Sequence, residues 1–351
     1  MAQLAPRDSA GAYIRPPSQF RQWIRASDNT TVVADSTLPR YEAEGDRYRL
    51  YVGMGCPWAH RTLVVRAIKE LTDIIPITVV VPSVDEGGWV FEKPEQGYRT
   101  LKDLYQHAQP GYSGRSTVPL LWDSKTQTIV NNESADIIVM LNEAFEAVNR
   151  PKRHQAENVQ GSSNQLKQGN SPNDPPNNSP DRSQNSPFVS SINLYPDDLK
   201  PRIDRWNEKI YHAVNNGVYR CGFAQTQAAY DQACDELFTA LDDIDATLAN
   251  QRYLCGSTLT LADIRLFTTL FRFDIVYYGL FKCNRRRIQD YPNLNLYLRD
   301  IYQLPGVADT CDLEAIKRDY YGNLFPLNPG QIIPSGPDIT NLLEPHHRET
   351  L

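Results

Sequence analysis

The sequence lacks the features that mark membrane, exported or nucleic-acid-binding proteins. Its longest apolar stretch, residues 74–81, is interrupted by Pro76 and is far shorter than the ~20 residues that a membrane-spanning helix needs. The chain has 36 Lys and Arg residues against 42 Asp and Glu residues, so it has no excess of positive charge with which to neutralise phosphates. The first residues include no hydrophobic segment, and we expect no secretory signal. These absences predict a cytoplasmic protein with no nucleic-acid or membrane partner.

Cysteine is sparse and has no tight spacing. The six cysteines of the 351-residue chain are Cys56, Cys221, Cys234, Cys255, Cys283 and Cys311. In a chain of this length without an export signal, such scattered cysteines indicate reduced thiols and not a disulfide framework. No metal is expected.

The first half of the chain predicts an α/β domain. Residues 1–45 are polar and turn-rich and form an N-terminal extension, with a short helix expected at residues 19–24. Residues 46–150 then follow the order βαβ, α, β, β, α, read from their apolar periodicity. The expected strands are 48–54, 77–82, 117–123 and 127–133. One helix is expected directly after Pro57, and two more at 98–107 and 134–148. A long polar connection is expected around Trp89.

The second half predicts an all-helical domain behind a low-complexity insertion. In residues 161–187, 17 of 27 residues are Asn, Pro or Ser, a composition that cannot bury enough apolar surface to order itself. We therefore assign 151–189 to a disordered insertion, 190–325 to an all-α domain and 326–351 to a C-terminal tail. Within the all-α domain, Thr260 and Asp263 have the spacing of a capping box that starts a buried helix.

The tetrapeptide Cys56-Pro57-Trp58-Ala59 stands where a strand gives way to a helix. A thiol at a helix N-terminus lies beside unpaired N–H groups and the positive end of the helix dipole, and both favour the thiolate near neutral pH. Pro57 suits the first helical position because its missing N–H would have had no partner. The competing interpretation is a buried, inert cysteine. Because the fourth residue is Ala59, a reactive Cys56 would need an external thiol to resolve its disulfide.

Two other dipeptides suggest ligand contacts. Pro119 cannot donate to a central strand, so Val118-Pro119 marks a strand start or a cis peptide bond that leaves the Val118 backbone free to pair with an extended ligand. Glu133-Ser134 stands at a strand-to-helix junction, where an acid, a hydroxyl and helix amides suit an α-amino acid headgroup. Alternatively, Ser134 is a plain N-cap.

Several stretches of the chain resemble one family. They include YVGMGCPWAHRTL, YSGRSTVPLLWD, NNESADII, NNGVYRCGFA, TLTLADIRLFTTLFRFDIVYY and PLNPGQIIPSGP. By these motifs the chain resembles the glutathionyl-hydroquinone reductases, the Xi class of glutathione transferases, which are similar to the Omega-like transferases. The resemblance implies an α/β thioredoxin-like N-terminal domain, an all-α C-terminal domain, a homodimer, and glutathione as co-substrate for reducing glutathionyl-hydroquinones.

The resemblance also implies roles for individual residues. Cys56 matches the catalytic nucleophile. The glutathione-binding residues it implies are Trp89, Val118 with Pro119, Glu133 and Ser134, with Arg99 or Arg115 for the glycine carboxylate. The aromatic substrate pocket it implies is lined by Tyr219, Tyr277 and Tyr320, of which Tyr219 and Tyr320 are assigned catalytic roles. Gly322-Asn323 departs from the Ser-His pair usual in the family, which concerns substrate preference and not the thiol chemistry.

These assignments predict a two-step exchange. Cys56 attacks the sulfur of a glutathionyl-hydroquinone, a tyrosine hydroxyl protonates the departing ring, and a second glutathione resolves the mixed disulfide. The alternatives are an Omega-type thioltransferase or dehydroascorbate reductase that uses the same Cys56, and a non-catalytic adaptor with a transferase fold. Classical conjugation of glutathione is a weaker candidate, because a cysteine in this place tends to form a disulfide with glutathione.

Overall fold

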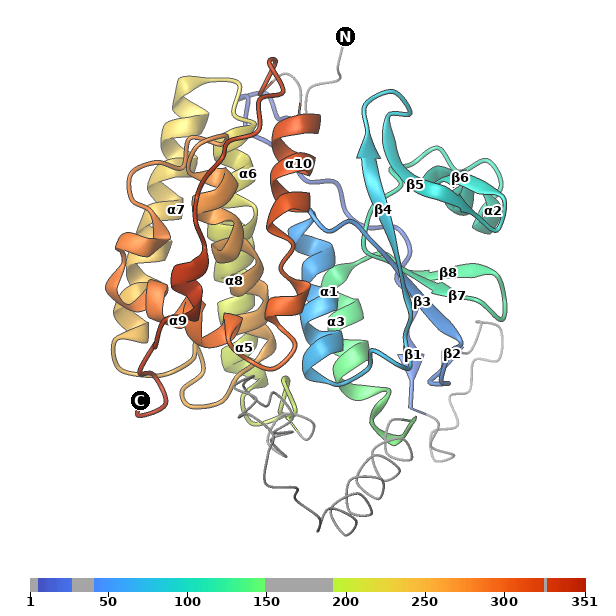
Figure 1. Ribbon diagram of the computed structural model, residues 1–351, viewed down its shortest axis with the longest axis horizontal. Coiled ribbons are helices and arrows are strands. Elements are labelled where there is room, and N and C mark those ends of the chain that lie inside the picture. The colour runs from blue at the N-terminus through green and yellow to red at the C-terminus, as the bar shows by residue number, and fades with distance from the viewer. Residues whose placement is uncertain (1–5, 27–40, 149–191, 325–326) are drawn as a thin grey trace, which may run out of the picture.

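The computed structural model describes residues 6–26, 41–148, 192–324 and 327–351. It places an α/β part beside a helical part, with α1 (Pro57–Ile68) and α3 (Ser134–Glu143) between the sheet and the remaining helices (Figure 1). The order of elements agrees with the predicted α/β domain followed by an all-α domain. The predicted disordered insertion, 151–189, lies outside the described residues.

The sheet has six strands in the order β6-β5-β4-β3-β7-β8. Its central strands β3 (Tyr48–Val52) and β4 (Ile77–Ser83) are parallel, as expected for strands joined by a crossover helix. The other neighbours pair antiparallel: β3 with β7 (Leu120–Asp123), β7 with β8 (Thr128–Asn131), β4 with β5 (Gly88–Glu95), and β5 with β6 (Tyr98–Thr100). The parallel pair brings the end of β3, and the turn after it, to the side of the sheet that faces the helical part.

The expectation of a polar connection around Trp89 is wrong, because Trp89 lies in β5 and pairs with Pro82 of β4. The hairpin of β5 and β6 was missed because it lies at the sheet edge with mostly exposed side chains, so it has little apolar alternation to detect. The helix that follows, α2 (Leu101–Ala108), begins at a capping box of Thr100 and Asp103 and confirms the helix expected at 98–107 to within three residues.

The second part of the chain is helical, as the sequence predicts. Its elements are α5 (Lys200–Lys209), η1 (Ile210–Asn215), α6 (Gly217–Gly222), α7 (Gln227–Leu248), α8 (Leu261–Arg272), η2 (Phe273–Tyr277), η3 (Ile288–Asp290), α9 (Pro292–Tyr302), η4 (Ala308–Thr310), α10 (Leu313–Asn323) and η5 (Thr340–Leu343). The carboxylate of Asp263 accepts from the Thr260 N–H at 2.8 Å, which confirms the predicted capping box. Helix α10 lies against β4, beside the start of α1 (Figure 1).

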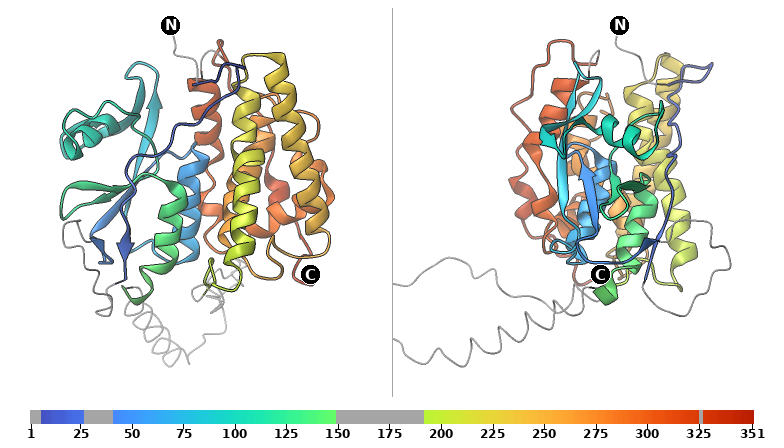
Figure 2. Two further views of the ribbon diagram at one scale, coloured as in Figure 1. Left: turned by 180° about the vertical axis from the view of Figure 1, so that it is seen from behind. Right: turned by 90° about the vertical axis from the view of Figure 1, so that its right-hand side faces the viewer.

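The N-terminal segment is extended where a helix was expected at residues 19–24. Its strand β1 (Ile24–Arg25) pairs with β2 (Tyr41–Glu42), and Gln22 donates its N–H to the Val130 carbonyl at 2.9 Å. At its other end the segment reaches the helical part, where the Gln225 N–H donates to the Gly11 carbonyl at 3.1 Å. Figure 2 shows it crossing from one part to the other. Pairing with the edge strand β8 satisfies its backbone and outweighs a short helix.

In the part of the chain that the structure describes, no helix has the length and apolarity to cross a bilayer.

Candidate active site

Cys56 lies at the turn between β3 and α1, as its sequence context predicts. It is the N-cap residue of α1, with Pro57 in the first helical turn. The Cys56 N–H donates to the Gly53 carbonyl at 3.0 Å, and the Cys56 carbonyl accepts from the His60 N–H at 3.0 Å. Its Sγ lies 3.8 Å from the carbonyl oxygen of Val118. The thiol is therefore held at the start of a helix and beside the backbone that was expected to pair with a ligand.

Two opposing effects set the acidity of this thiol. The backbone amides of Ala59 and Trp58 and the guanidinium groups of Arg15 and Arg272 favour the thiolate. Burial disfavours it more strongly, so that the pKa of Cys56 is raised above its ordinary value. The helix N-terminus favours the thiolate, as the sequence analysis expected. The expected low pKa of Cys56 is wrong, because burial has the larger effect and could not be judged from the sequence.

Charged residues of the helical part hold the backbone turn that carries Cys56. Arg272, at the end of α8, donates to the carbonyls of Gly55 at 2.8 Å and Met54 at 2.9 Å. Asp319, on α10, accepts from the Gly55 N–H at 3.0 Å. The approach requires glycine, because a Cβ at position 55 would lie 2.4 Å from the Asp319 carboxylate. The two parts of the molecule are thus joined next to the thiol.

A cavity of about 800 Å³ opens at Cys56. Of the predicted site residues, the structure brings six to its wall: Cys56, Trp89, Arg115, Val118, Tyr219 and Tyr320. Its other lining residues include Tyr13, Arg15, Phe223 and Asp319, to which the sequence analysis gave no role. Both parts of the molecule and the N-terminal segment therefore contribute to one site.

The tyrosines form a hydrogen-bonded group. The hydroxyls of Tyr219 and Tyr320 are 2.6 Å apart, and those of Tyr277 and Tyr320 are 3.0 Å apart. Tyr277 is fully buried behind Tyr320 and does not line the cavity, contrary to its predicted place in the pocket wall. Burial raises the pKa of Tyr277 to about 12 and raises the pKa values of Tyr219 and Tyr320 well above 10. All three hydroxyls are therefore hydrogen-bond donors at neutral pH.

The peptide bond Val118–Pro119 is cis, one of the two possibilities that the sequence left open. Val118 and Thr117 line the cavity beside Cys56, whereas Pro119 does not. The Val118 backbone is thus placed next to the thiol, and Pro119 sets the course of the chain into β7.

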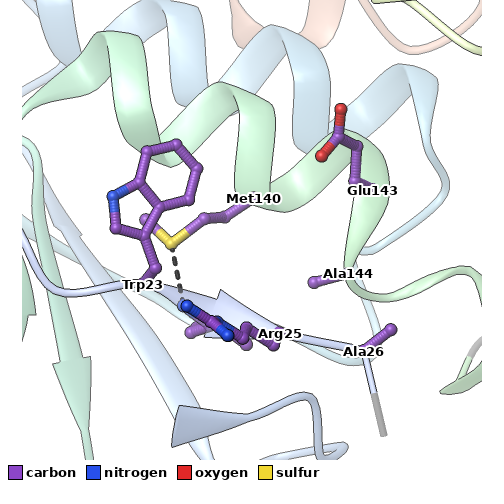
Figure 3. Close-up of a pocket in the computed structure, with 7 residues that line it drawn as sticks. Trp23, Arg25, Ala26, Met140, Glu143 and Ala144 are labelled. Atoms are coloured by element: carbon purple, nitrogen blue, oxygen red, sulfur yellow. Dashed lines mark hydrogen bonds between the residues drawn. The ribbon is translucent and has the colours of Figure 1, made fainter. Parts of the chain in front are cut away.

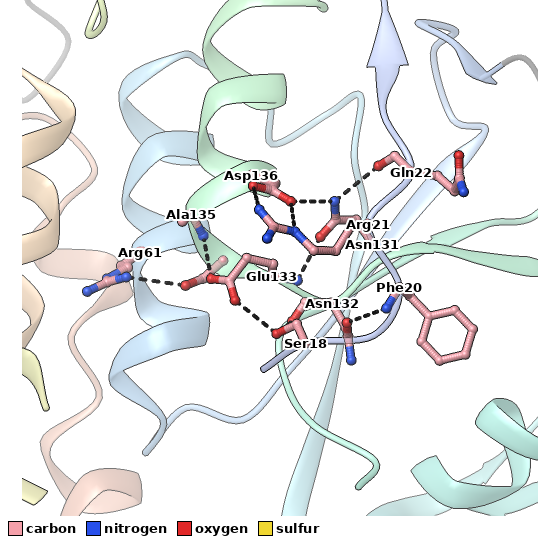
Figure 4. Close-up of polar contacts among 11 residues, drawn as sticks. Ser18, Phe20, Arg21, Gln22, Arg61, Asn131, Asn132, Glu133, Ala135 and Asp136 are labelled. Atoms are coloured by element: carbon pink, nitrogen blue, oxygen red, sulfur yellow. Dashed lines mark hydrogen bonds and ion pairs between the residues drawn. The ribbon is translucent and has the colours of Figure 1, made fainter. Parts of the chain in front are cut away.

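Glu133 and Ser134 stand at the start of α3 (Figure 4), and neither lines the cavity. The Glu133 carboxylate caps the helix by accepting from the Ala135 N–H at 3.0 Å, and it also accepts from the Ser18 hydroxyl at 2.9 Å. The Ser134 hydroxyl is buried and accepts from Arg61 of α1 at 3.3 Å. Both side chains therefore have protein partners in this structure, one of them from the N-terminal segment.

The two arginines proposed for the glycine carboxylate are separated by the fold. Arg115 lines the cavity. Arg99 lies in β6, is 75% exposed and pairs with Glu86 at 2.9 Å, and it does not line the cavity. The reason is the missed hairpin of β5 and β6, which carries Arg99 to the sheet edge. The structure thus leaves Arg115 as the candidate of the two.

Arg15 is a cavity residue that the sequence analysis missed. Its guanidinium lies 3.9 Å from the centre of the Trp58 ring, a cation–π contact next to the turn that carries Cys56. In the described part of the chain, its side chain has no hydrogen bond or ion pair with a protein group. The only signal in the sequence is an arginine in an otherwise uncharged stretch, AYIRPPSQF, and this signal was too weak to use.

A second cavity, of about 480 Å³, lies between β1 and α3 (Figure 3). It is lined by Trp23, Ile24, Arg25, Ala26, Met140, Glu143 and Ala144, and none of these is a predicted site residue. Across the described residues, no cluster of His, Cys, Asp or Glu is arranged to hold a metal ion.

Comparison with known proteins identifies the family. A family model for the N-terminal domain of glutathione S-transferase matches residues 55–144, and one for the C-terminal domain matches residues 227–300. Glutathionyl-hydroquinone reductase YqjG of Escherichia coli is 41% identical over 98% of this chain and 94% of its own length. Glutathionyl-hydroquinone reductase PcpF of Sphingobium chlorophenolicum is 38% identical over 94% and 91% of the two chains.

Solved structures agree with this result. The glutathione-bound structure of E. coli YqjG matches with a TM-score of 0.76 and 42% identity, covering 94% of this chain and 96% of that one. The glutathione S-transferase Xi of Phanerochaete chrysosporium matches with a TM-score of 0.78 and 38% identity, covering 97% of each chain. The chain belongs to the glutathione transferase family and, within it, to the glutathionyl-hydroquinone reductases. The predicted fold class, a thioredoxin-like domain followed by an all-α domain, is confirmed.

Proposed function

We propose that this enzyme uses Cys56 to reduce glutathionyl-hydroquinones to hydroquinones at the expense of glutathione. Relatives that share about two fifths of its residues over nearly the full length are named for this activity. The observation that carries the proposal is the cavity, whose wall includes one cysteine at a helix N-terminus together with Tyr219 and Tyr320, the hydroxyls of which are 2.6 Å apart.

Glutathione lies along the α/β side of the cavity in this proposal. The backbone of Val118 pairs with the cysteinyl part of glutathione, and Trp89 flanks it. Glu133 and Ser134, at the start of α3, hold the γ-glutamyl end, where helix amides favour a carboxylate. Arg115 binds the glycine carboxylate. Arg15 supplies a second guanidinium, and a glutathione carboxylate is a partner for this cation, which has no ion pair among the described residues.

The aromatic ring lies on the helical side. Tyr219 and Tyr320 donate hydrogen bonds to the ring oxygens, and Phe223 and Tyr13 pack against the ring. Ring centroids of Tyr13 and Phe223 are 5.7 Å apart, so this wall is already an aromatic surface. Tyr277 acts from behind by orienting the Tyr320 hydroxyl.

The chemistry is a pair of thiol–disulfide exchanges. The Cys56 thiolate attacks the glutathione sulfur of the substrate, the bond from sulfur to the ring carbon breaks, and the ring carbon takes a proton. A second glutathione then attacks the Cys56 mixed disulfide and leaves as oxidised glutathione. Because burial raises the pKa of Cys56, only a small fraction of the thiol is ionised at neutral pH, but a thiolate of high pKa is also the stronger nucleophile.

Mass spectrometry tests this proposal directly. Incubation with glutathionyl-menadiol alone should release menadiol and add one glutathionyl group, about 305 Da, to Cys56. Added glutathione should remove the group. If the wild-type enzyme releases no menadiol and gains no adduct, or if Cys56→Ser still turns over, the proposal is wrong.

The same cysteine could serve a thioltransferase or a dehydroascorbate reductase, and the tyrosines separate these activities. A disulfide or dehydroascorbate substrate needs no donor to a hydroquinone oxygen. Removing the Tyr219 hydroxyl should therefore slow menadiol release far more than exchange with a small disulfide. We further propose that the enzyme is a homodimer in the cytoplasm and that it needs no metal.

A further inference from the structure

The net reaction moves a proton as well as a glutathionyl group. Glutathione enters with a hydrogen on sulfur, and the product hydroquinone leaves with a hydrogen on the ring carbon that bore the sulfur. Some group near Cys56 has to take this proton from the second glutathione and give it to the ring of the next substrate. Such a group works best when both of its protonation states are populated near the working pH.

The tyrosines are poorly suited to take up and release this proton. A tyrosine that gave its proton to the ring would become a phenolate, and burial disfavours that phenolate at Tyr219, Tyr277 and Tyr320, whose pKa values are all raised. Among the described residues that line the cavity, Asp319 alone carries a carboxyl group, the kind of group that can take up and release a proton near neutral pH when it is buried.

Asp319 has the geometry for this role. It lines the cavity on α10, one residue before Tyr320 and in contact with the residue before Cys56. Its Oδ2 accepts from the Gly55 N–H, while its Oδ1 is buried and has no hydrogen-bond partner in the described structure. The Nε of Arg318 lies 3.7 Å from Oδ1, beyond hydrogen-bond distance. One oxygen is thus anchored and the other is free to bind a proton.

The surroundings of Asp319 allow both protonation states. Burial and, to a smaller extent, the charge of Asp312 at the start of α10 raise the pKa of Asp319, which is about 6 once all its neighbours have acted. The Gly55 amide, Arg318 on α10 and Arg272 on α8 oppose this rise by favouring the carboxylate. A carboxyl group in this balance exchanges its proton close to neutral pH.

We propose that Asp319 carries the proton of the reaction from the thiol of the second glutathione to the ring carbon of the hydroquinone. This inference rests on the proposed function. The Asp319 carboxylate takes the thiol proton, the glutathione thiolate attacks the glutathione sulfur of the mixed disulfide, and the bond from that sulfur to Cys56 breaks with its electron pair on Cys56. In the next turnover the Cys56 thiolate attacks the substrate sulfur, the electron pair of the broken carbon–sulfur bond goes to the ring carbon, and Asp319 protonates that carbon.

The proposal predicts a characteristic pH dependence for each half of the reaction. Menadiol release needs the Cys56 thiolate together with the protonated Asp319 carboxyl group. This reactive form carries one proton in total, like the form with a Cys56 thiol and an Asp319 carboxylate, so the ratio of the two forms does not change with pH. Between the pKa of Asp319 and that of Cys56 the reactive form is therefore a constant fraction of the enzyme, and the rate should rise to about pH 6 and then level off. Discharge of the Cys56 adduct by glutathione should level off above about pH 6 in the same way.

The experiment measures both half reactions from pH 5 to pH 9 in wild type and in Asp319→Asn, which keeps an acceptor for the Gly55 N–H. In Asp319→Asn both rates should be about 100-fold lower at pH 7 and should keep rising about tenfold per pH unit, because the thiolates then form without the carrier. Asp319→Glu should restore the plateau. Asp309→Asn, which removes an exposed carboxylate elsewhere, should behave like wild type.

Each other outcome overturns the proposal. If Asp319→Asn keeps the wild-type rates and plateau while Asp319→Ala is slow, Asp319 only positions the Gly55 turn. If wild type shows no plateau, no residue with this pKa carries the proton. Failure of the proposed function looks different, since wild type would then form no Cys56 adduct at all. Thermal melting of each variant shows whether it is folded.

Discussion

The two sides of the cavity are built in different ways. On the α/β side, the thiol and its surroundings come from two short stretches, 53–59 and 115–119, each with a readable local pattern. On the opposite side, the wall combines residues from the N-terminal segment, α6 and α10. Tyr219 and Tyr320 were predicted there only from the family resemblance, and Arg15 and Asp319 were not predicted at all. The proposed nucleophile is thus encoded locally, whereas the residues proposed for substrate recognition and proton transfer come from segments far apart in the sequence.

The sharpest test of the α/β side is Cys56→Ser, with Cys311→Ser as its matched control. Both cysteines are half-buried, but only Cys56 lines the cavity, and burial raises the pKa of Cys311 to about 12. We expect Cys56→Ser to lower kcat with glutathionyl-menadiol by about 10³-fold or more, because the nucleophile is lost. Cys311→Ser should keep its activity. Equal losses in both variants would contradict the special role of residue 56.

The aromatic wall is tested by Tyr320→Phe, with Tyr230→Phe as control. Tyr320 exchanges hydrogen bonds with Tyr219 and Tyr277, whereas the Tyr230 hydroxyl only donates to the Lys282 carbonyl, at 2.7 Å. Removing the Tyr320 hydroxyl should lower kcat for menadiol release by about 10- to 100-fold, since one hydrogen bond to a developing charge is lost. Exchange with a small disulfide should change less than threefold. A uniform loss in both assays would mean that the tyrosine only supports the fold.

The N-terminal segment is tested by Arg15→Gln. We expect KM for glutathione to rise about tenfold, because a charge-assisted hydrogen bond to a carboxylate contributes about 1.5 kcal/mol. Because the Arg15 guanidinium favours the thiolate, the pKa of Cys56 should rise further, which alkylation by iodoacetamide at several pH values measures. Arg99→Gln removes an equally charged but exposed residue and serves as control. A larger effect of Arg99→Gln on KM would mean that Arg99, at the sheet edge, binds the glutathione carboxylate, and would contradict the role of Arg15.

The smallest expected effect is on stability. The pKa of Asp319 is raised from 3.8 to about 6 in the folded protein, so the native state binds more protons than the unfolded state between these values. Stability therefore falls as pH rises through this window, by about 1–3 kcal/mol, and the loss persists at neutral pH. Asp319→Asn should raise the free energy of unfolding by that amount at pH 7 and by almost nothing below pH 4. Urea unfolding at both pH values measures it. A variant that is less stable than wild type at pH 7 would contradict the argument.

Predictions from the sequence are confirmed where the structure depends only on residues that are neighbours along the chain. The N-terminal position of Cys56 on its helix and the capping box at Thr260 and Asp263 follow from neighbouring residues and agree with the structure. The hairpin that carries Trp89 and Arg99 was missed, because its exposed strands lack apolar alternation. Tyr277 was predicted to line the cavity, but it lies behind Tyr320. The prediction failed because a family motif does not say which of two contacting tyrosines lines the cavity.

The sequence by itself determined the division into an α/β part and an all-α part and the helix start at Cys56, because backbone capping and side-chain periodicity act over a few residues, and its motifs determined the family. Only the tertiary structure decided that Arg15 and Asp319 join the cavity, that Arg99 does not, and that the pKa of Cys56 is raised and not lowered. Desolvation and charge proximity depend on which atoms surround a group in space. In this protein those atoms come from segments that are more than 200 residues apart.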